Sequence, residues 1–432
     1  LAVLSSGTLL GQLLLVASSP TLTRLYGPEA FGVLAVFTAL SAVLGMAAAM
    51  RYEFAVPVAP EAEVPGLVWV GLAAAALLAL LTALGVWVAG PWLAALTATP
   101  ALAPLLWLLP GVVLLNGLAL PLGYWSIRRG TVRVNAANRL IYTGGQVVPQ
   151  LALGFAGGGA GALVLGYAAG SVAQLAHLLW TLPAAQRAQL AAVRLRELWP
   201  LARRHWHYPA YSAPSALLQA GTQLAPAVLL AALYGPAAAG WFGLGQRVVG
   251  LPTKLLANAA SQVFIGEAPR LGDDAAVQRL FLRSTGGFAL LGLAGLAPVA
   301  LVGPALFALV FGEDWRAAGT MAALLVPQHL ARFVVVPVSQ TLNLYRRQDL
   351  HLVASIANAL AFGLAFGLAL PLGLGVMEVV AFYSAGTTIA YLIYLWFAWR
   401  VARRGGLDAA AASASTASDA FGRSLRPPLD TV

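Results

Sequence analysis

Long apolar runs alternate with short polar segments along the whole chain, and twelve such runs can be counted. Each run is long enough, or nearly so, to cross the ~30 Å hydrocarbon core of a bilayer as an α-helix. Within a run the apolar residues are continuous, whereas the ~10-residue strands of a membrane β-barrel would alternate. The pattern predicts an all-α membrane protein with about 12 transmembrane helices, at 3–22, 31–50, 66–89, 104–124, 140–156, 160–182, 208–233, 237–257, 285–310, 317–342, 351–370 and 378–399.

The composition agrees with this pattern and excludes several chemistries. Of 432 residues, 60% are hydrophobic and only 9% are charged, against roughly 25% charged residues in soluble domains. Cysteine is absent, so neither a disulfide nor a thiolate metal site can form. The sequence contains no Walker A motif and no H-E-x-x-H zinc motif. We therefore expect no catalytic site, no metal and no cofactor, and an energy source other than direct ATP hydrolysis.

Basic residues are distributed unevenly between the two sets of loops. If the segments after the even-numbered runs are cytoplasmic, these segments and the C-terminal tail hold 21 of the 25 basic residues. The opposite side holds only Arg24 and Arg316, while Arg247 and Arg332 fall within runs. Cytoplasmic loops of membrane proteins are enriched in Lys and Arg. The net charge of +10 therefore indicates orientation rather than nucleic-acid binding, and both termini are predicted to be cytoplasmic.

The two ends of the chain have different compositions. The chain opens inside an apolar run with no charged leader and no cleavage site, so a removable signal peptide is not predicted. We expect that a few residues precede Leu1. From Gly405 onward the sequence is rich in Ala and Ser, a composition typical of disordered segments.

A nine-residue phrase occurs twice, as RLYGPEAFG at 24–32 and as ALYGPAAAG at 232–240. Six of the nine positions match, and each copy connects the first two runs of a six-run half. Because six is even, both halves have the same orientation, which describes a parallel repeat about an axis along the membrane normal. A chance recurrence of a Gly-Pro turn is the alternative. The repeat predicts two six-helix bundles at 1–182 and 208–404, joined by a cytoplasmic linker at 183–207 and followed by a disordered cytoplasmic tail at 405–432.

Charged residues within the runs are candidate functional residues, because a charge in hydrocarbon costs at least ~2.5–3.5 kcal/mol. Arg24 ends the first run, Arg51 and Glu53 end the second, and Arg247 lies in the middle of the eighth. Arg24 can also be a snorkelling residue, Arg51 an interface anchor, and Glu53 the partner of a nearby arginine. Arg247 is the hardest to explain structurally, because about ten apolar residues flank it on each side.

Arg332 in the tenth run and Glu378 in the twelfth are further candidates for a cavity or for ion coupling. Arg332 can instead pair within its own bundle, and Glu378 lies at a span boundary. A cavity lined by arginines and few carboxylates would be electropositive and would attract anions, since guanidinium groups match phosphate oxygens bidentately. This charge pattern disfavours a cation or a cationic drug as the substrate.

Three phrases accompany the repeated Tyr-Gly-Pro, namely TLTRLYGPEAFGVLAVF at 21–37, MRYEFAVPVAP at 50–60 and GLGQRVVGLPTKLLANAASQVF at 243–264. With these phrases and its twelve-run plan, the chain resembles the polysaccharide transporter family. These are the bacterial O-antigen and exopolysaccharide flippases (lipopolysaccharide biosynthesis proteins) of the multidrug/oligosaccharidyl-lipid/polysaccharide exporter superfamily. The resemblance implies a V-shaped pair of six-helix bundles with a central cavity. It also implies transfer of an undecaprenyl-diphosphate-linked oligosaccharide from the cytoplasmic to the periplasmic leaflet of the inner membrane.

The resemblance also suggests site residues and partners. The related lipid II flippases have cavity arginines in the first, second and eighth spans, and Arg24, Arg51 and Arg247 fall at comparable places. This implies that these three residues contact the diphosphate of the lipid-linked oligosaccharide. Besides membrane lipid, a polysaccharide polymerase and chain-length machinery are the implied partners. Two alternatives stay open, a multidrug or small-solute antiporter of the same fold and a membrane-embedded enzyme such as a polymerase.

Overall fold

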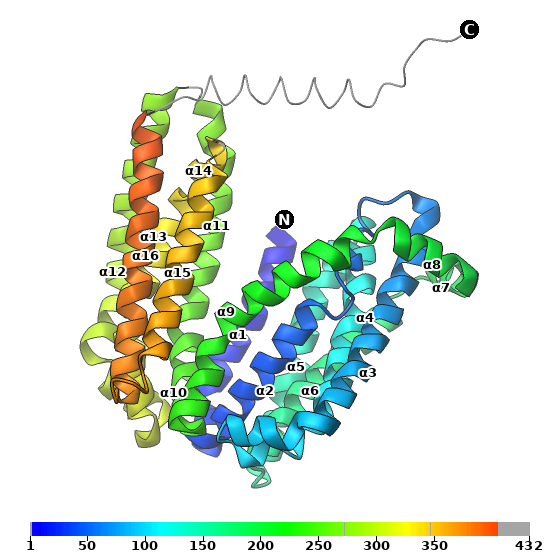
Figure 1. The fold of residues 1–432 in the computed structure, drawn as a ribbon, viewed down its shortest axis with the longest axis horizontal. Helices are drawn as coiled ribbons and strands as arrows, with labels where there is room; N and C mark the ends of the chain where they lie inside the picture. Colours follow the sequence, from blue (N-terminus) through cyan, green and yellow to red (C-terminus); the bar gives the residue numbers. More distant parts are fainter. Residues whose placement is uncertain (1, 272, 346, 405–432) are drawn as a thin grey trace. The chain divides into compact units, whose positions relative to one another are not determined.

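All regular elements in the described part of the chain are helices (Figure 1). The structure is a computed structural model that describes residues 2–271, 273–345 and 347–404. The predicted disordered tail at 405–432 lies outside the described residues. The helices are α1 (Ala2–Leu25), α2 (Pro28–Met46), α3 (Val64–Leu96), α4 (Leu109–Arg128), α5 (Val132–Phe155), α6 (Ala160–Trp180), α7 (Ala184–Ala191), α8 (Leu195–Arg204), α9 (Ala213–Tyr234), α10 (Pro236–Gly245), α11 (Leu251–Glu267), α12 (Asp274–Phe311), α13 (Arg316–Val338), α14 (Gln340–Leu344), α15 (Gln348–Gly367) and α16 (Val376–Arg404).

A helical segment occupies the position of each of the twelve predicted runs, so the prediction of an all-α membrane protein is confirmed. Within the described residues, nine helical stretches are long and apolar enough to cross a membrane. The three predicted runs outside this set are α1, α5 and α9, with 24, 24 and 22 residues. At 1.5 Å per residue each is about 33–36 Å long, which also suffices to span the hydrocarbon core.

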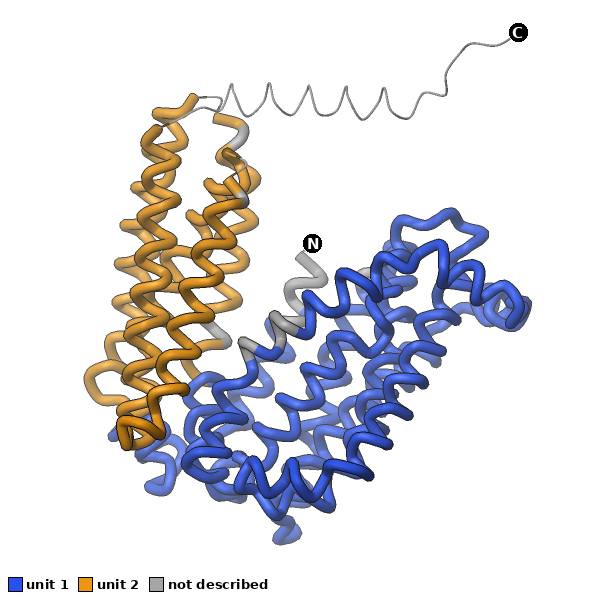
Figure 2. Tube along the Cα trace, in the orientation of Figure 1, with its two compact units in different colours: residues 1–247, 304–319 blue, residues 248–303, 320–432 orange. Residues whose placement is uncertain are grey.

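The chain divides into two compact units (Figure 2). Unit 1 contains Leu1–Arg247 and Pro304–Gly319, and unit 2 contains Val248–Gly303 and Thr320–Val432. This division does not follow the predicted linker at 183–207, because α9 and α10 pack against α2 and so belong to unit 1. One boundary falls within the π-helical turn Gln246–Gly250. Another falls between Gly303 and Pro304, next to Val302, where α12 has non-helical angles of φ −127° and ψ 18°.

The two copies of the repeated phrase contact each other where α2 crosses α10 in unit 1. A Cβ atom added at Gly32 would lie 1.8 Å from the carbonyl oxygen of Pro236, and one added at Gly240 would lie 2.0 Å from that of Pro28. The final Gly of each copy therefore contacts the Pro of the other copy. Glycine permits this backbone contact because it has no side chain. The reciprocal contact is what two repeats related by a pseudo-two-fold axis would make.

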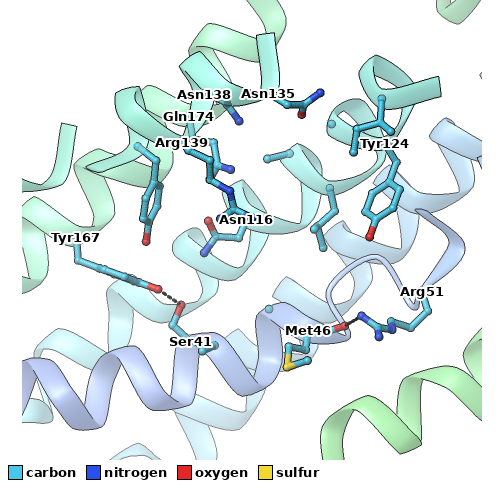
Figure 3. Close-up of a pocket in the computed structure, with 17 residues that line it drawn as sticks. Ser41, Met46, Arg51, Asn116, Tyr124, Asn135, Asn138, Arg139, Tyr167 and Gln174 are labelled. Atoms are coloured by element: carbon cyan, nitrogen blue, oxygen red, sulfur yellow. Dashed lines mark hydrogen bonds between the residues drawn. The ribbon is translucent and has the colours of Figure 1, made fainter. Parts of the chain in front are cut away.

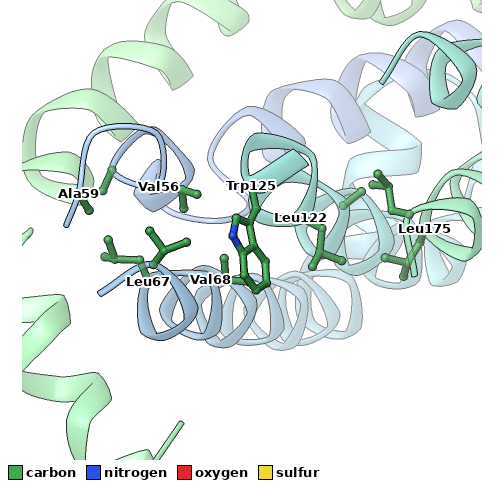
Figure 4. Close-up of a cluster of buried hydrophobic side chains, with 11 residues drawn as sticks. Val56, Ala59, Leu67, Val68, Leu122, Trp125 and Leu175 are labelled. Atoms are coloured by element: carbon green, nitrogen blue, oxygen red, sulfur yellow. The ribbon is translucent and has the colours of Figure 1, made fainter. Parts of the chain in front are cut away.

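The segment after α2 is fixed by packing and by hydrogen bonds. Trp125 of α4 is fully buried in an apolar cluster with residues of α3, α4, α6 and of this segment, including Val56 and Leu67 (Figure 4). Arg128 Nη1 donates to the carbonyl oxygens of Val56 and Ala59, at 2.8 and 2.7 Å. These contacts hold the segment against the ends of α3 and α4, next to the site described below.

Candidate functional site

A cavity of about 480 Å³ opens inside unit 1 between α2, α4, α5, α6 and the segment after α2. The side chains around it are mostly polar, and Figure 3 shows them converging from these elements. No acidic residue is among its lining residues, whereas two are arginines. The polar lining residues are Ser41, Arg51, Asn116, Tyr124, Asn135, Asn138, Arg139, Tyr142, Tyr167 and Gln174.

One face of α5 supplies much of this lining. Asn135, Asn138, Arg139 and Tyr142 are spaced i, i+3, i+4 and i+7 and all reach the cavity, as neighbours on one helical face should. The run predicted at 140–156 began too late, because α5 starts at Val132. The polar residues on this face of α5 lower the mean hydropathy of its first turns. Their helical spacing is the signal in the sequence that would have identified the site.

Arg139 is a cationic group available to a ligand. Its side chain points into the cavity toward Asn116 (Figure 3). It makes no side-chain hydrogen bond and no ion pair with any residue that the structure describes. Arg139 lies one residue before the run predicted at 140–156, in a segment predicted to be a cytoplasmic loop, and so it was not predicted as a site residue.

Arg51 lines the same cavity with a strained backbone. Arg51 and Met50 have φ angles of 65° and 50°, a left-handed conformation that costs non-glycine residues about 1–3 kcal/mol and is common at functional sites. The Arg51 side chain donates to the carbonyl oxygen of Met46 at 3.3 Å, and its guanidinium carbon lies 4.4 Å from the ring centroid of Phe54. The Nε atom of Arg51 is buried and has no hydrogen-bond partner within the described residues.

Glu53 is a buried acidic residue that forms a long ion pair with Arg51. Its side chain is only 1% exposed, and Oε1 is 3.8 Å from Nη1 of Arg51. The other carboxyl oxygen, Oε2, is buried with no partner among the described residues. Burial raises the pKa of Glu53, and this outweighs the opposite effects of its own backbone N–H and of the Arg51 charge.

Arg24 and Arg247 lie at the other end of α2. Arg24 is exposed in the last turn of α1, just before α2 begins. Arg247, half-buried in the π-helical turn, has its guanidinium carbon 5.7 Å from the ring of Phe31, in the first turn of α2. The 19 residues of α2 extend over about 28 Å. The structure therefore groups Arg51 with Arg139, and it does not bring Arg51 together with Arg24 and Arg247.

The remaining candidates lie outside this cavity. Arg332 is half-buried on α13 in unit 2. Glu378 is exposed in the first turn of α16 and accepts a hydrogen bond from the backbone N–H of Gly375, at 2.7 Å. Their roles in a cavity or in coupling stay predictions. Within the described residues, no cluster of His, Asp or Glu has the grouping needed to hold a metal ion.

Long apolar helices around a polar internal cavity define a multi-pass membrane protein with a candidate binding site inside a helical unit. The same fold occurs in lipid II flippase MurJ in an inward closed conformation, with a TM-score of 0.70 and 11% identity over 92% of this chain and 87% of that one. An inward-facing multidrug resistance MATE family transporter of the MOP superfamily matches with a TM-score of 0.63 and 15% identity, over 91% of this chain and 95% of that chain. A MOP superfamily transporter from Pyrococcus furiosus gives 0.56 and 14%, over 94% of this chain and 95% of that chain.

The sequence itself identifies the family. The profile described as polysaccharide biosynthesis protein matches residues 21–319. The chain therefore belongs to the polysaccharide biosynthesis protein family, as its phrases indicated. A search of curated proteins finds no sequence match.

Proposed function

We propose that this protein is a flippase for an undecaprenyl-diphosphate-linked oligosaccharide, an O-antigen or exopolysaccharide repeat unit. It carries this lipid from the cytoplasmic to the periplasmic leaflet of the bacterial inner membrane by alternating access, with both of its own termini in the cytoplasm. A polysaccharide polymerase and its chain-length machinery then use the delivered unit.

The observation that carries this proposal is the pair Arg51 and Arg139 in a cavity without an acidic lining residue. A diphosphate needs cationic donors with planar, forked geometry, which guanidinium groups provide. Arg139 has no ion pair among the described residues, and Arg51 makes only a long ion pair with Glu53, at 3.8 Å, whose carboxyl does not line the cavity. A lipid-linked substrate is further supported by the family and by the fold shared with a lipid II flippase.

Arg24 and Arg247 provide a second cationic region at the opposite end of α2. We assign them to the diphosphate as well, at a different stage of transport from Arg51 and Arg139. A diphosphate is too small to reach both ends of a helix about 28 Å long at once. The substrate would leave one pair of arginines before it meets the other.

A multidrug or small-solute antiporter of the same fold is the second candidate, since MATE transporters share the fold. The lining of the cavity disfavours a cationic drug as the substrate, because Arg51 and Arg139 would repel it. This candidate predicts that deletion of the gene raises drug sensitivity and leaves surface polysaccharide intact.

The test measures the sidedness of a lipid-linked oligosaccharide in proteoliposomes that contain the purified protein. We expect protein-dependent exposure on the far leaflet, and a loss of about 10-fold or more in Arg139→Ala and Arg51→Ala, because hydrogen bonds to charged groups contribute about 1.5–3 kcal/mol each. Arg247→Ala should also slow transport. The matched control is Arg133→Ala, an exposed arginine of α5 that does not line the cavity.

Two results would contradict the proposal. If Arg51→Ala and Arg139→Ala both transport the lipid at the wild-type rate, this cavity does not bind the diphosphate. An absence of exposure with wild-type protein, with and without ion gradients, would favour a small-solute exporter of the same architecture.

A further inference from the structure

The cavity of unit 1 contains more polar groups than a diphosphate needs. Beside the two arginines, its walls carry four side-chain amides and three tyrosines, contributed by α4, α5 and α6 (Figure 3). An amide group offers two donors and an acceptor, and a phenol offers one donor and acceptor lone pairs. Buried or half-buried polar groups in such number normally have partners. These groups are Asn116, Tyr124, Asn135, Asn138, Tyr142, Tyr167 and Gln174.

Several of these groups have hydrogen-bonding capacity that the protein does not use. Nδ2 of Asn135 is buried with no partner within the described residues. The side chains of Asn116 and Gln174 also make no hydrogen bond to another described residue, although both line the cavity. The site therefore presents unused donors and acceptors of neutral charge next to its two arginines.

Other members are held in place as parts of the wall. Oδ1 of Asn138 lies 3.2 Å from Nδ1 of His177, and the hydroxyl of Tyr167 is 3.3 Å from Oγ of Ser41. The rings of Tyr142 and Tyr167 meet edge to face, with centroids 6.3 Å apart and an angle of 85° between planes. Such fixed aromatic and amide groups form a preorganised surface, which lowers the entropic cost of binding a ligand.

We infer that this neutral part of the cavity is a subsite for the first sugar residue of the substrate, a neutral pyranose joined directly to the diphosphate. The inference rests on the proposed function. In a glycosyl diphosphate the sugar ring follows the phosphate by a single bridging oxygen, so its subsite must adjoin the cationic groups. On α5, Asn135 and Tyr142 lie one turn to either side of Arg139. Neutral polar groups therefore adjoin a cationic group, as a sugar subsite beside a diphosphate requires.

The chemistry of the lining matches a pyranose better than other polar ligands. Sugar hydroxyls both donate and accept, as amides and phenols do, and the apolar C–H face of a sugar ring can pack on tyrosine rings. A metal or organic cation has no carboxylate to bind among the lining residues. An inorganic anion would use Arg51 and Arg139 and would leave the amides without partners.

The experiment compares the binding of two probes to the full-length protein in detergent. One probe is undecaprenyl diphosphate, and the other is the same lipid carrying one glucose, galactose or N-acetylglucosamine. We expect at least one sugar-bearing lipid to bind more tightly than the bare lipid. Asn116→Ala and Gln174→Ala should each weaken that lipid by about 3- to 10-fold, the effect of a lost hydrogen bond, and should leave the affinity of the bare lipid unchanged.

Two control variants separate this inference from the proposed function. Arg139→Ala should weaken both lipids, and Gln189→Ala, an exposed amide of α7 outside the cavity, should weaken neither. If no sugar adds affinity, or if the amide variants weaken both lipids equally, the sugar subsite is wrong and the amides line a water-filled space around an anion site. If Arg139→Ala and Arg51→Ala both leave the affinities of the two lipids unchanged, the diphosphate role of this cavity in the proposed function fails.

Discussion

At the scale of single residues, Glu53 is the acidic group whose burial has the clearest measurable consequence. Its carboxyl is 1% exposed, one oxygen has no partner among the described residues, and its pKa is raised, mainly by burial. A raised pKa means that the folded state binds the proton more tightly than the unfolded chain. The protonated Glu53 therefore contributes its full stabilisation of the folded state at a pH below the ordinary pKa of 4.5. This contribution is lost as the pH rises through the higher pKa of the folded state.

We predict that Glu53→Gln removes this loss and raises the stability of the protein at neutral pH. The gain should be on the order of 1–3 kcal/mol, the typical cost of a buried polar group without a partner. Thermal unfolding in detergent between pH 4 and 8, read from tryptophan fluorescence, measures it. The control is Glu61→Gln, because Glu61 is exposed and pairs with Arg128 at 3.0 Å, and exposed pairs contribute little. A lower Tm for Glu53→Gln at pH 7 would instead mean that attraction to Arg51 outweighs burial.

At the scale of helices, the crossing of α2 and α10 depends on two glycines. We predict that Gly32→Ala and Gly240→Ala each destabilise the protein by about 1–3 kcal/mol or more, because the new methyl group would overlap a proline carbonyl oxygen on the other helix. Elsewhere in a helix, Gly→Ala is favourable by about 1 kcal/mol. Denaturation of each variant in detergent, followed by tryptophan fluorescence, measures the change.

Gly243→Ala is the matched control for this crossing. Gly243 is also on α10, but its added Cβ would be 3.6 Å from the nearest side chain, an ordinary contact. This variant should be neutral or more stable than the wild type. If Gly240→Ala is as stable as Gly243→Ala, the two backbones do not touch at this point and the repeat contact is wrong.

The same crossing shows how far the sequence predicts the elements. The repeated phrase identified the turns before α2 and α10, because Gly-Pro is a strong local signal for a turn followed by a helix. It could not show that the two copies pack on each other, since contacts across 208 residues leave no local pattern. On α5, the long apolar run begins after the start of the helix, at residue 140 instead of Val132. Polar residues that face an internal cavity resemble loop residues when only hydropathy is considered.

At the scale of the whole molecule, the positions of the spanning helices were the most predictable feature. A bilayer requires every backbone group to be paired within its own segment, so long apolar runs form helices with little dependence on tertiary packing. The division into units was not predictable in this way. It depends on α9 and α10 packing against α2 and on local breaks such as Val302 in α12. Arg24, Arg51 and Arg247 were chosen by position along spans, and only tertiary structure groups Arg51 with Arg139 instead.

The orientation of the chain can be tested directly, because the protein has no native cysteine. Every single-cysteine variant then carries one thiol, and a membrane-impermeant maleimide reports which side of the membrane it faces. Exposed positions exist on both predicted sides of the membrane. On the predicted periplasmic side, Gly159 is suited to substitution because nothing lies within 4 Å of an added Cβ. Leu372 is 58% exposed, between α15 and α16. On the predicted cytoplasmic side, Gln189 of α7 and Arg279 of α12 are exposed.

We predict that Gly159→Cys and Leu372→Cys react with the maleimide in right-side-out vesicles, and that Gln189→Cys and Arg279→Cys react only in inverted vesicles or after permeabilisation. The reason is the excess of arginine in the segments that hold the second pair, which the positive-inside rule assigns to the cytoplasm. Gly159 and Leu372 come from the first and second predicted bundles, whereas Gln189 comes from the linker that follows the first bundle and Arg279 from the second bundle. If the two halves reported opposite orientations, an odd number of spans would separate them and the repeat would be inverted rather than parallel. Agreement between the halves with both sides exchanged would leave the parallel repeat intact and contradict the predicted cytoplasmic location of both termini.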